Sequence, residues 1–143
     1  MLFFNKEKEK QEYVIIVGCG RLGAKIANEL STQGKNVMMI DKDADSFRRL
    51  DSNFGGLNIV GDGTDLDLLK ENHIEDASIV LALTNNDNIN HIIAQMARTI
   101  FDVKDVVLRL SDPEKRCVVE DTSIHVLCPA ILSAQAIESV LRG

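Results

Sequence analysis

The sequence predicts an α/β fold in which a doubly wound, six-stranded parallel sheet carries helices on both faces. Three observations predict it: short apolar runs recur along the chain, helical patterns separate them, and three glycines spaced G-x-G-x-x-G follow the first run. The runs are continuous rather than alternating, which is typical of strands covered on both faces. Right-handed crossovers between such strands build one parallel sheet.

Six apolar runs have the length and composition of buried strands. They cover residues 13–17 (YVIIV), 36–40 (NVMMI), 57–60 (LNIV), 78–83 (SIVLAL), 105–110 (DVVLRL) and 124–127 (IHVL). The intervals between them are long enough for a turn and a helix, so the strands alternate with helices along the whole chain.

Helical periodicity fills the intervals. From Arg21 an apolar stripe continues until the chain nears Gly34, and from Asn86 a second stripe covers three turns to Ile100. The segment from Pro129 to the end also reads as a helix, because proline is favoured in a first helical turn. Shorter helices are expected around residues 44–53, 65–72 and 112–120.

Length and composition limit the possible functions. The chain has 143 residues, so we expect one domain over residues 13–143, preceded by a flexible lead-in over residues 1–12. The net charge of -6 argues against nucleic acid as a partner. No apolar run approaches the roughly 20 residues that cross a bilayer, which argues against direct membrane insertion.

Cysteine and histidine usage predicts a cytosolic protein without a metal site. The 3 cysteines form no CxxC pair, which argues against a disulfide framework. The 3 histidines share no metal-ligand spacing with them. Cys19 precedes a predicted helix start that favours a thiolate, so redox sensing is one interpretation, although a small residue filling a tight loop is the favoured one.

The glycine loop has the context of a Rossmann-like phosphate site. It follows a strand and opens a helix, which are the two conditions that give the motif weight. Gly18 permits the tight turn, Gly20 lets a phosphate approach the backbone, and Gly23 allows the helix to pack against the sheet. The helix then offers free N–H groups to an anion.

Asp41 ends the second strand, where an acidic residue accepts hydrogen bonds from an adenosine ribose. A carboxylate there repels a 2′-phosphate, so the site is expected to prefer NAD or a plain adenine nucleotide over NADP. The alternative is a helix N-cap, for which Asp43 competes.

Polar residues also follow the third and fourth strands. Asp62 and Thr64 are candidates for the adenine edge or for capping the next helix. Phosphate or ribose contacts are expected from Thr84, Asn85 and Asn86. Arg109 is a charge inside an apolar strand, and either a nucleotide phosphate or an internal Asp would serve as its partner.

Several segments together resemble one protein family. They are YVIIVGCGRLGAKIANEL, VMMIDKD, GLNIVGDGTDLDLLKENHIEDASIVLALTNNDNIN, VVLRLSDPEK and VLCPAILSA, in that order. This series resembles the N-terminal domain of RCK proteins, also called the KTN or TrkA-N family, which supplies nucleotide-binding regulatory subunits of Trk and Ktr potassium transporters. Ordinary dehydrogenases do not usually carry GDGTD followed by TNNDNIN.

The resemblance implies a regulatory binding site without catalytic residues. It implies an adenine nucleotide, with NAD(H) as first choice and ATP, ADP or AMP as second, and it places Arg21 and Arg109 toward the phosphates. The expected site residues are Gly18, Cys19, Gly20, Arg21, Leu22, Gly23, Asp41, Lys42, Gly61, Asp62, Gly63, Thr64, Thr84, Asn85, Asn86 and Arg109.

The resemblance also implies partners. A homodimer or larger ring would form through the last helix, and a membrane pore subunit of a potassium transporter would hold the protein at the inner face of the membrane. The second, smaller regulatory domain of many members is expected to be absent, since the sequence ends at Gly143. The alternatives are a fragment of an NAD-dependent oxidoreductase and a nucleotide sensor for a partner outside transport.

Overall fold

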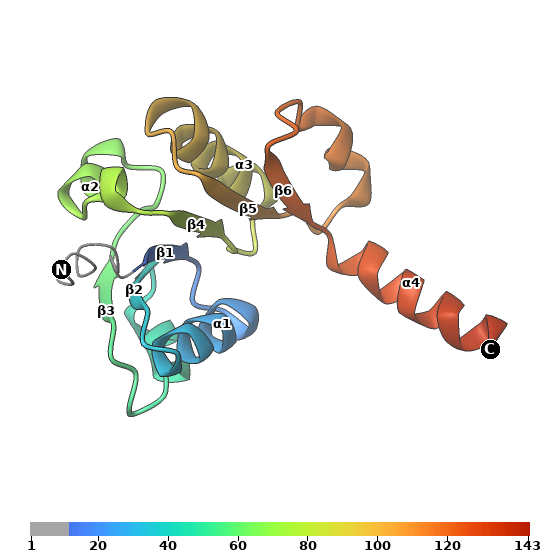
Figure 1. Ribbon diagram of the computed structural model, residues 1–143, viewed down its shortest axis with the longest axis horizontal. Helices are drawn as coiled ribbons and strands as arrows, with labels where there is room; N and C mark the ends of the chain where they lie inside the picture. The colour runs from blue at the N-terminus through green and yellow to red at the C-terminus, as the bar shows by residue number, and fades with distance from the viewer. Residues whose placement is uncertain (1–11) are drawn as a thin grey trace, which may run out of the picture.

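The computed structural model describes residues 12–143, so the lead-in expected at residues 1–12 lies almost wholly outside the described part. Six strands form one sheet in the order β3-β2-β1-β4-β5-β6, and every neighbouring pair is parallel (Figure 1). The order reverses between β1 and β4, which confirms the predicted Rossmann-like sheet. The strands are β1 (Tyr13–Val17), β2 (Asn36–Asp41), β3 (Leu57–Val60), β4 (Ile79–Ala82), β5 (Asp105–Arg109) and β6 (Ile124–Leu127).

The longer predicted helices are present, and two of the three short ones are tighter than an α-helix. The α-helices are α1 (Arg21–Thr32), α2 (Leu66–Glu71), α3 (Asp87–Gln95) and α4 (Pro129–Arg142). A π-helical turn, η4 (Met96–Ile100), extends α3. The helices predicted around 44–53 and 112–120 are 3₁₀ helices, and a third 3₁₀ turn was not predicted. They are η2 (Ala44–Arg49), η5 (Pro113–Val118) and η3 (Ile74–Asp76).

The core has two layers, one on each face of the sheet. Ile15 and Val17 of β1 pack on the side of α2 and α3, whereas Val14 and Ile16 pack on the side of α1 and η2. This split follows from the alternation of side chains along a strand. Figure 1 shows α1 on one side of the sheet and α2 with α3 on the other.

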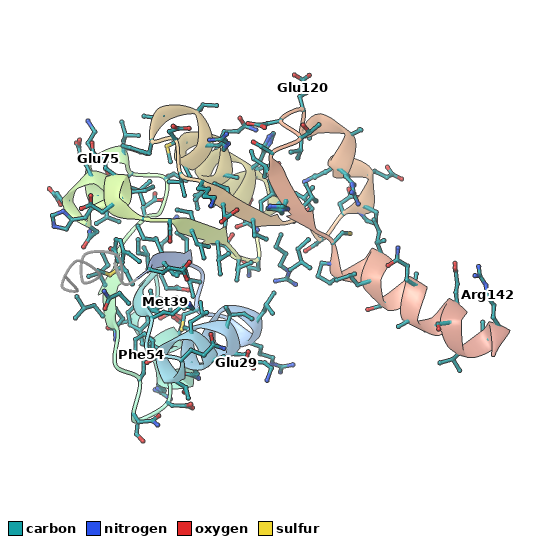
Figure 2. All side chains as sticks on the ribbon, in the orientation of Figure 1. Glu29, Met39, Phe54, Glu75, Glu120 and Arg142 are labelled. Atoms are coloured by element: carbon teal, nitrogen blue, oxygen red, sulfur yellow. The ribbon has the colours of Figure 1, made fainter. Side chains whose placement is uncertain are left out.

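On the face of the sheet that carries α1, the half formed by β4 and β5 is only partly covered. Ile79, Leu81 and Val107 lie side by side there and are only half buried. The last helix, α4, does not cover this half: it leaves the domain after β6, and within residues 12–143 none of its residues is buried (Figure 1). Its side chains stand clear of the domain out to Arg142 (Figure 2).

Candidate functional site

A cavity of about 450 Å³ opens where the parallel strands end. The loops after β1, β2, β3 and β4 meet there, as the switch point requires. Most of the predicted site residues line it, namely Gly18, Cys19, Gly20, Asp41, Lys42, Gly61, Asp62, Gly63, Thr84, Asn85, Asn86 and Arg109. The cavity lining does not include Arg21, Leu22, Gly23 or Thr64.

Gly18 and Gly23 are required by the fold itself. Gly18 has φ +112°, and a Cβ there would stand 2.7 Å from the backbone of Leu83 and Thr84. A Cβ on Gly23 would overlap the carbonyl oxygen of Gly18. These two glycines therefore set the turn and the close approach of α1, as the motif predicts.

Gly20 differs from them. Its φ of −84° suits any residue, and a Cβ built there would meet no atom of the described residues, 12–143, within 4 Å. Packing within the protein gives no reason for a glycine at this place on the cavity wall. As the N-cap of α1, Gly20 also provides no side-chain cap, so the first amides of α1 remain open to an anion.

The carboxylate of Asp41 joins two loops at the cavity wall. Its Oδ2 accepts a hydrogen bond of 2.7 Å from the backbone N–H of Cys19, and its Oδ1 accepts one of 2.8 Å from that of Asp43. The capping role belongs to Asp43, whose side chain accepts from the N–H of Asp45 at the start of η2. Asp41 is half buried, and each of its oxygens retains acceptor capacity.

Cys19 is a packed residue that ties the glycine loop to η2. Besides its N–H contact with Asp41, its thiol donates to the carbonyl of Ser46, and its own carbonyl accepts from Nη1 of Arg49, both at 3.3 Å. Burial raises the pKa of the Cys19 thiol, and the Asp41 carboxylate raises it further. The thiol form is thereby favoured, which supports the loop-filling interpretation over redox sensing.

The loop after β3 presents Asp62 to the cavity. Oδ1 of Asp62 accepts from the hydroxyl of Thr64 at 2.7 Å and from its N–H at 2.9 Å, and these bonds lower the pKa of the carboxyl. Helix capping here falls to Asp65, which accepts from two amides of α2. Nζ of Lys42 lies 4.0 Å from Oδ2 of Asp62, so this wall carries a balanced charge pair.

Asn90 fixes the loop after β4, and sequence reasoning missed it. Its buried side chain accepts from the N–H and hydroxyl of Thr84 at 2.9 and 2.6 Å and donates to the carbonyls of Thr84 and Arg109 at 3.0 and 2.9 Å. The ends of β4 and β5 are thus held together beside the cavity. An asparagine on the buried face of α3, one turn before Ile93, was the available signal.

Arg109 ends β5 and carries an unsatisfied donor. Its Nε is buried and has no hydrogen-bond partner within residues 12–143, and no ion pair engages its guanidinium in that range. The internal Asp proposed as one possible partner is therefore not found. An unsatisfied buried donor costs about 1–3 kcal/mol, so an anion in the cavity would relieve this cost.

Three charges of each sign line the cavity. The cations are Lys42, Arg49 and Arg109, and the carboxylates are Asp41, Asp43 and Asp62. Sequence reasoning missed Arg49, because nothing in the helical pattern distinguishes it from Arg48. Arg21, which was expected to face the phosphates, instead lines a neighbouring depression that shares Arg49 with the cavity.

Two searches of the described residues give negative results. No helix between residues 12 and 143 has the length and apolar character of a membrane span. In the same range, no three His, Cys, Asp or Glu side chains form a group that could hold a metal ion.

The strand order and the cavity at the switch point define a Rossmann-type domain, the class of fold that seats nucleotides at this edge of the sheet. The model of the TrkA-N domain matches residues 14–129, so the chain belongs to the TrkA-N domain family.

A Streptomyces coelicolor protein called "Trk system potassium uptake protein TrkA" is 43% identical over 112 residues, which are 78% of this chain and 50% of that protein. The chain thus spans about half the length of this curated relative. The NAD(P)-binding domain of an exopolyphosphatase-related protein from Archaeoglobus fulgidus superposes with a TM-score of 0.75 at 27% identity, covering 93% of this chain and 98% of that one. The TrkA-N domain of the inner membrane protein ybaL from Escherichia coli, at 16% identity, has a TM-score of 0.80 with the same coverage and supports the fold.

Proposed function

We propose that the protein binds an adenine nucleotide in the cavity and regulates a Trk- or Ktr-type potassium transporter from the cytoplasmic side of the membrane. NAD(H) is the preferred ligand, and ATP, ADP or AMP is the second choice. Two observations support nucleotide binding: the Nε of Arg109 is buried and unpaired within residues 12–143, and the backbone of Gly20 is open on the wall of the same cavity. The TrkA relative, together with family membership, supports the role in potassium uptake.

An NAD-dependent oxidoreductase is the alternative function. Among the described residues, the cavity lining holds no His or Tyr, and its lysine, Lys42, lies near the Asp62 carboxylate. The three carboxylates of the lining each accept hydrogen bonds from neighbouring backbone amides, so none is held ready as a general base. We therefore favour a site that binds without catalysis, and incubation with NAD and candidate alcohols should produce no NADH absorbance.

Replacement of Arg109 by glutamine should weaken ATP and NADH binding and leave adenosine binding nearly unchanged. The guanidinium is proposed to contact phosphate, and a charge-assisted hydrogen bond of this kind contributes about 1.5–3 kcal/mol. Calorimetric titrations of both proteins with the three ligands measure the effect. An equal loss for all three would indicate that Arg109 only maintains the structure.

Replacement of Asp41 by asparagine should weaken NADH and ATP binding by about 1–3 kcal/mol, because a ribose hydroxyl loses its charged acceptor. Asparagine retains one side-chain oxygen for the amides of Cys19 and Asp43, so it disturbs the loops less than alanine does. Asp45→Asn, which removes an exposed carboxylate of η2 that does not line the cavity, is the matched control. Equal effects of the two substitutions would contradict the ribose assignment.

Regulation requires that the protein has two states. We propose that these states differ in how subunits pack through α4. A nucleotide shifts an equilibrium only by its different affinities for the two states. A host strain carrying Gly20→Val should therefore show a changed potassium uptake rate at unchanged protein level. Uptake identical to that of the wild type would contradict the transport role, even if the purified protein binds nucleotide.

A further inference from the structure

A depression of about 550 Å³ adjoins the cavity along α1. Its wall consists of Arg21, Ala24, Lys25, Asn28, Glu29, Arg49 and Asp51. Arg49 lines both hollows, so its side chain stands at the border between them.

The guanidinium of Arg49 keeps hydrogen-bond donors that no residue in the range 12–143 engages. Within residues 12–143, its guanidinium makes one hydrogen bond, from Nη1 to the carbonyl of Cys19, and no ion pair. Its neighbour Arg48 lies 3.7 Å from the Asp45 carboxylate and is largely exposed, while Lys25 lies 3.2 Å from Glu29. Arg49 is thus an unneutralised cation at the border of the two hollows.

The contacts of Cys19 place this cation at the ribose end of the cavity. The same residue donates its N–H to Asp41 and accepts from Arg49 through its carbonyl. In this fold, the acidic residue after the second strand contacts the ribose 2′-hydroxyl, and an arginine nearby accommodates a 2′-phosphate. Two backbone amides bind the Asp41 carboxylate, and Arg49 binds the carbonyl of Cys19, the residue that donates one of these amides, so a cation stands close to the Asp41 charge.

We propose that Arg49 makes the adjoining depression a phosphate subsite, so that the cavity accepts 2′-phosphorylated adenine nucleotides of the NADP(H) class as well as NAD(H). This inference rests on the proposed nucleotide-binding function. It relaxes the sequence-based expectation that the site rejects a 2′-phosphate, because that expectation considered the charge of Asp41 without a compensating cation. The planar guanidinium suits the phosphate because its parallel N–H groups can bind two oxygens.

The test compares two pairs of ligands that differ only by the 2′-phosphate: NADH with NADPH, and 5′-AMP with 2′,5′-ADP. Wild-type protein should bind the two members of each pair with dissociation constants within about tenfold of each other. Arg49→Gln should weaken NADPH and 2′,5′-ADP about tenfold more than their partners, because the paired guanidinium is lost. Arg49→Lys should restore part of the difference.

Arg48→Gln is the matched control, because it removes a cation from the same 3₁₀ helix without touching either hollow's border. It should leave both affinity ratios unchanged. The ratio of the two dissociation constants within a pair also separates two effects of Arg49→Gln. Loss of phosphate recognition changes the ratio, whereas loosening of the glycine loop weakens both ligands of a pair equally. Two results would overturn this inference without affecting the proposed function. One is an unchanged affinity ratio in Arg49→Gln, and the other is a wild-type protein that binds NADH but rejects NADPH. Failure of every adenine nucleotide to bind would overturn the proposed function as well.

Discussion

Replacement of Gly20 by valine should greatly weaken nucleotide binding in a protein that still folds. The φ of −84° at Gly20 is open to L-residues, and a Cβ there meets no atom of residues 12–143 within 4 Å. The valine methyl groups would instead occupy the space through which a phosphate approaches the first amides of α1. We expect affinity for NADH and ATP to fall by roughly 100-fold, the scale of a few kcal/mol of steric conflict.

Gly18→Ala and Gly23→Ala are the informative comparisons. Each places a Cβ against backbone, so both should lower the free energy of unfolding, and Gly18 adds the strain of a positive φ. Circular dichroism melts and fluorescence titrations together separate the two effects. If folded Gly20→Val retains NADH binding, the loop is a structural turn and the site lies elsewhere.

The double substitution Ile137→Asp with Leu141→Asp should convert the proposed dimer into monomers that still bind nucleotide. Ile137 and Leu141 lie one turn apart on α4 and are 60% and 79% exposed. A helix that extends from the domain with such a stripe is stable only when another surface covers it. The half-buried strip of Ile79, Leu81 and Val107 offers one such surface.

The apolar area buried between the two copies decides whether this interface is stable. Burial gives about 25 cal/mol per Å², and association must offset several kcal/mol of lost motional freedom. Two copies related by a twofold axis bury the stripe twice, and two carboxylates in each stripe reverse that gain. We therefore expect complete dissociation at micromolar concentrations.

Gln135→Asp with Ser139→Asp is the matched control for the interface. It adds the same charge to the same helix, half a turn away from Ile137 and Leu141. Light scattering should show a dimer for this control and for the wild type. A wild-type monomer would remove the proposed coupling between nucleotide and pore, because a single domain has no subunit geometry to change.

Sequence patterns predicted the sheet because continuous apolar runs and helical stripes are local signals. They also predicted the roles of Gly18 and Gly23, since a turn and a close helix approach leave a fixed spacing. The 3₁₀ form of η2 and η5 was not predictable from periodicity. Six residues are too few to distinguish a 3₁₀ from an α-helix by their apolar spacing.

Two residues of the site escaped sequence-based prediction for a different reason. Asn90 and Arg49 act through contacts with segments 6 and 30 residues away in sequence, so only the folded chain shows their partners. Arg21 sits next to the glycines in sequence, yet α1 turns its side chain toward the adjoining depression. The outward direction of α4 was not predictable either, because its apolar stripe does not specify which surface the helix packs on.

The most direct test of the account is the ligand content and ligand affinity of the purified wild-type protein. Mass spectrometry of the denatured protein's supernatant, followed by calorimetric titration with NADH, ATP, ADP and AMP, makes this measurement. We predict that an adenine nucleotide is released or bound at one site per chain, that NADH and ATP compete, and that Gly20→Val removes both. A protein that releases no nucleotide and binds none of the four at millimolar concentration would contradict the account.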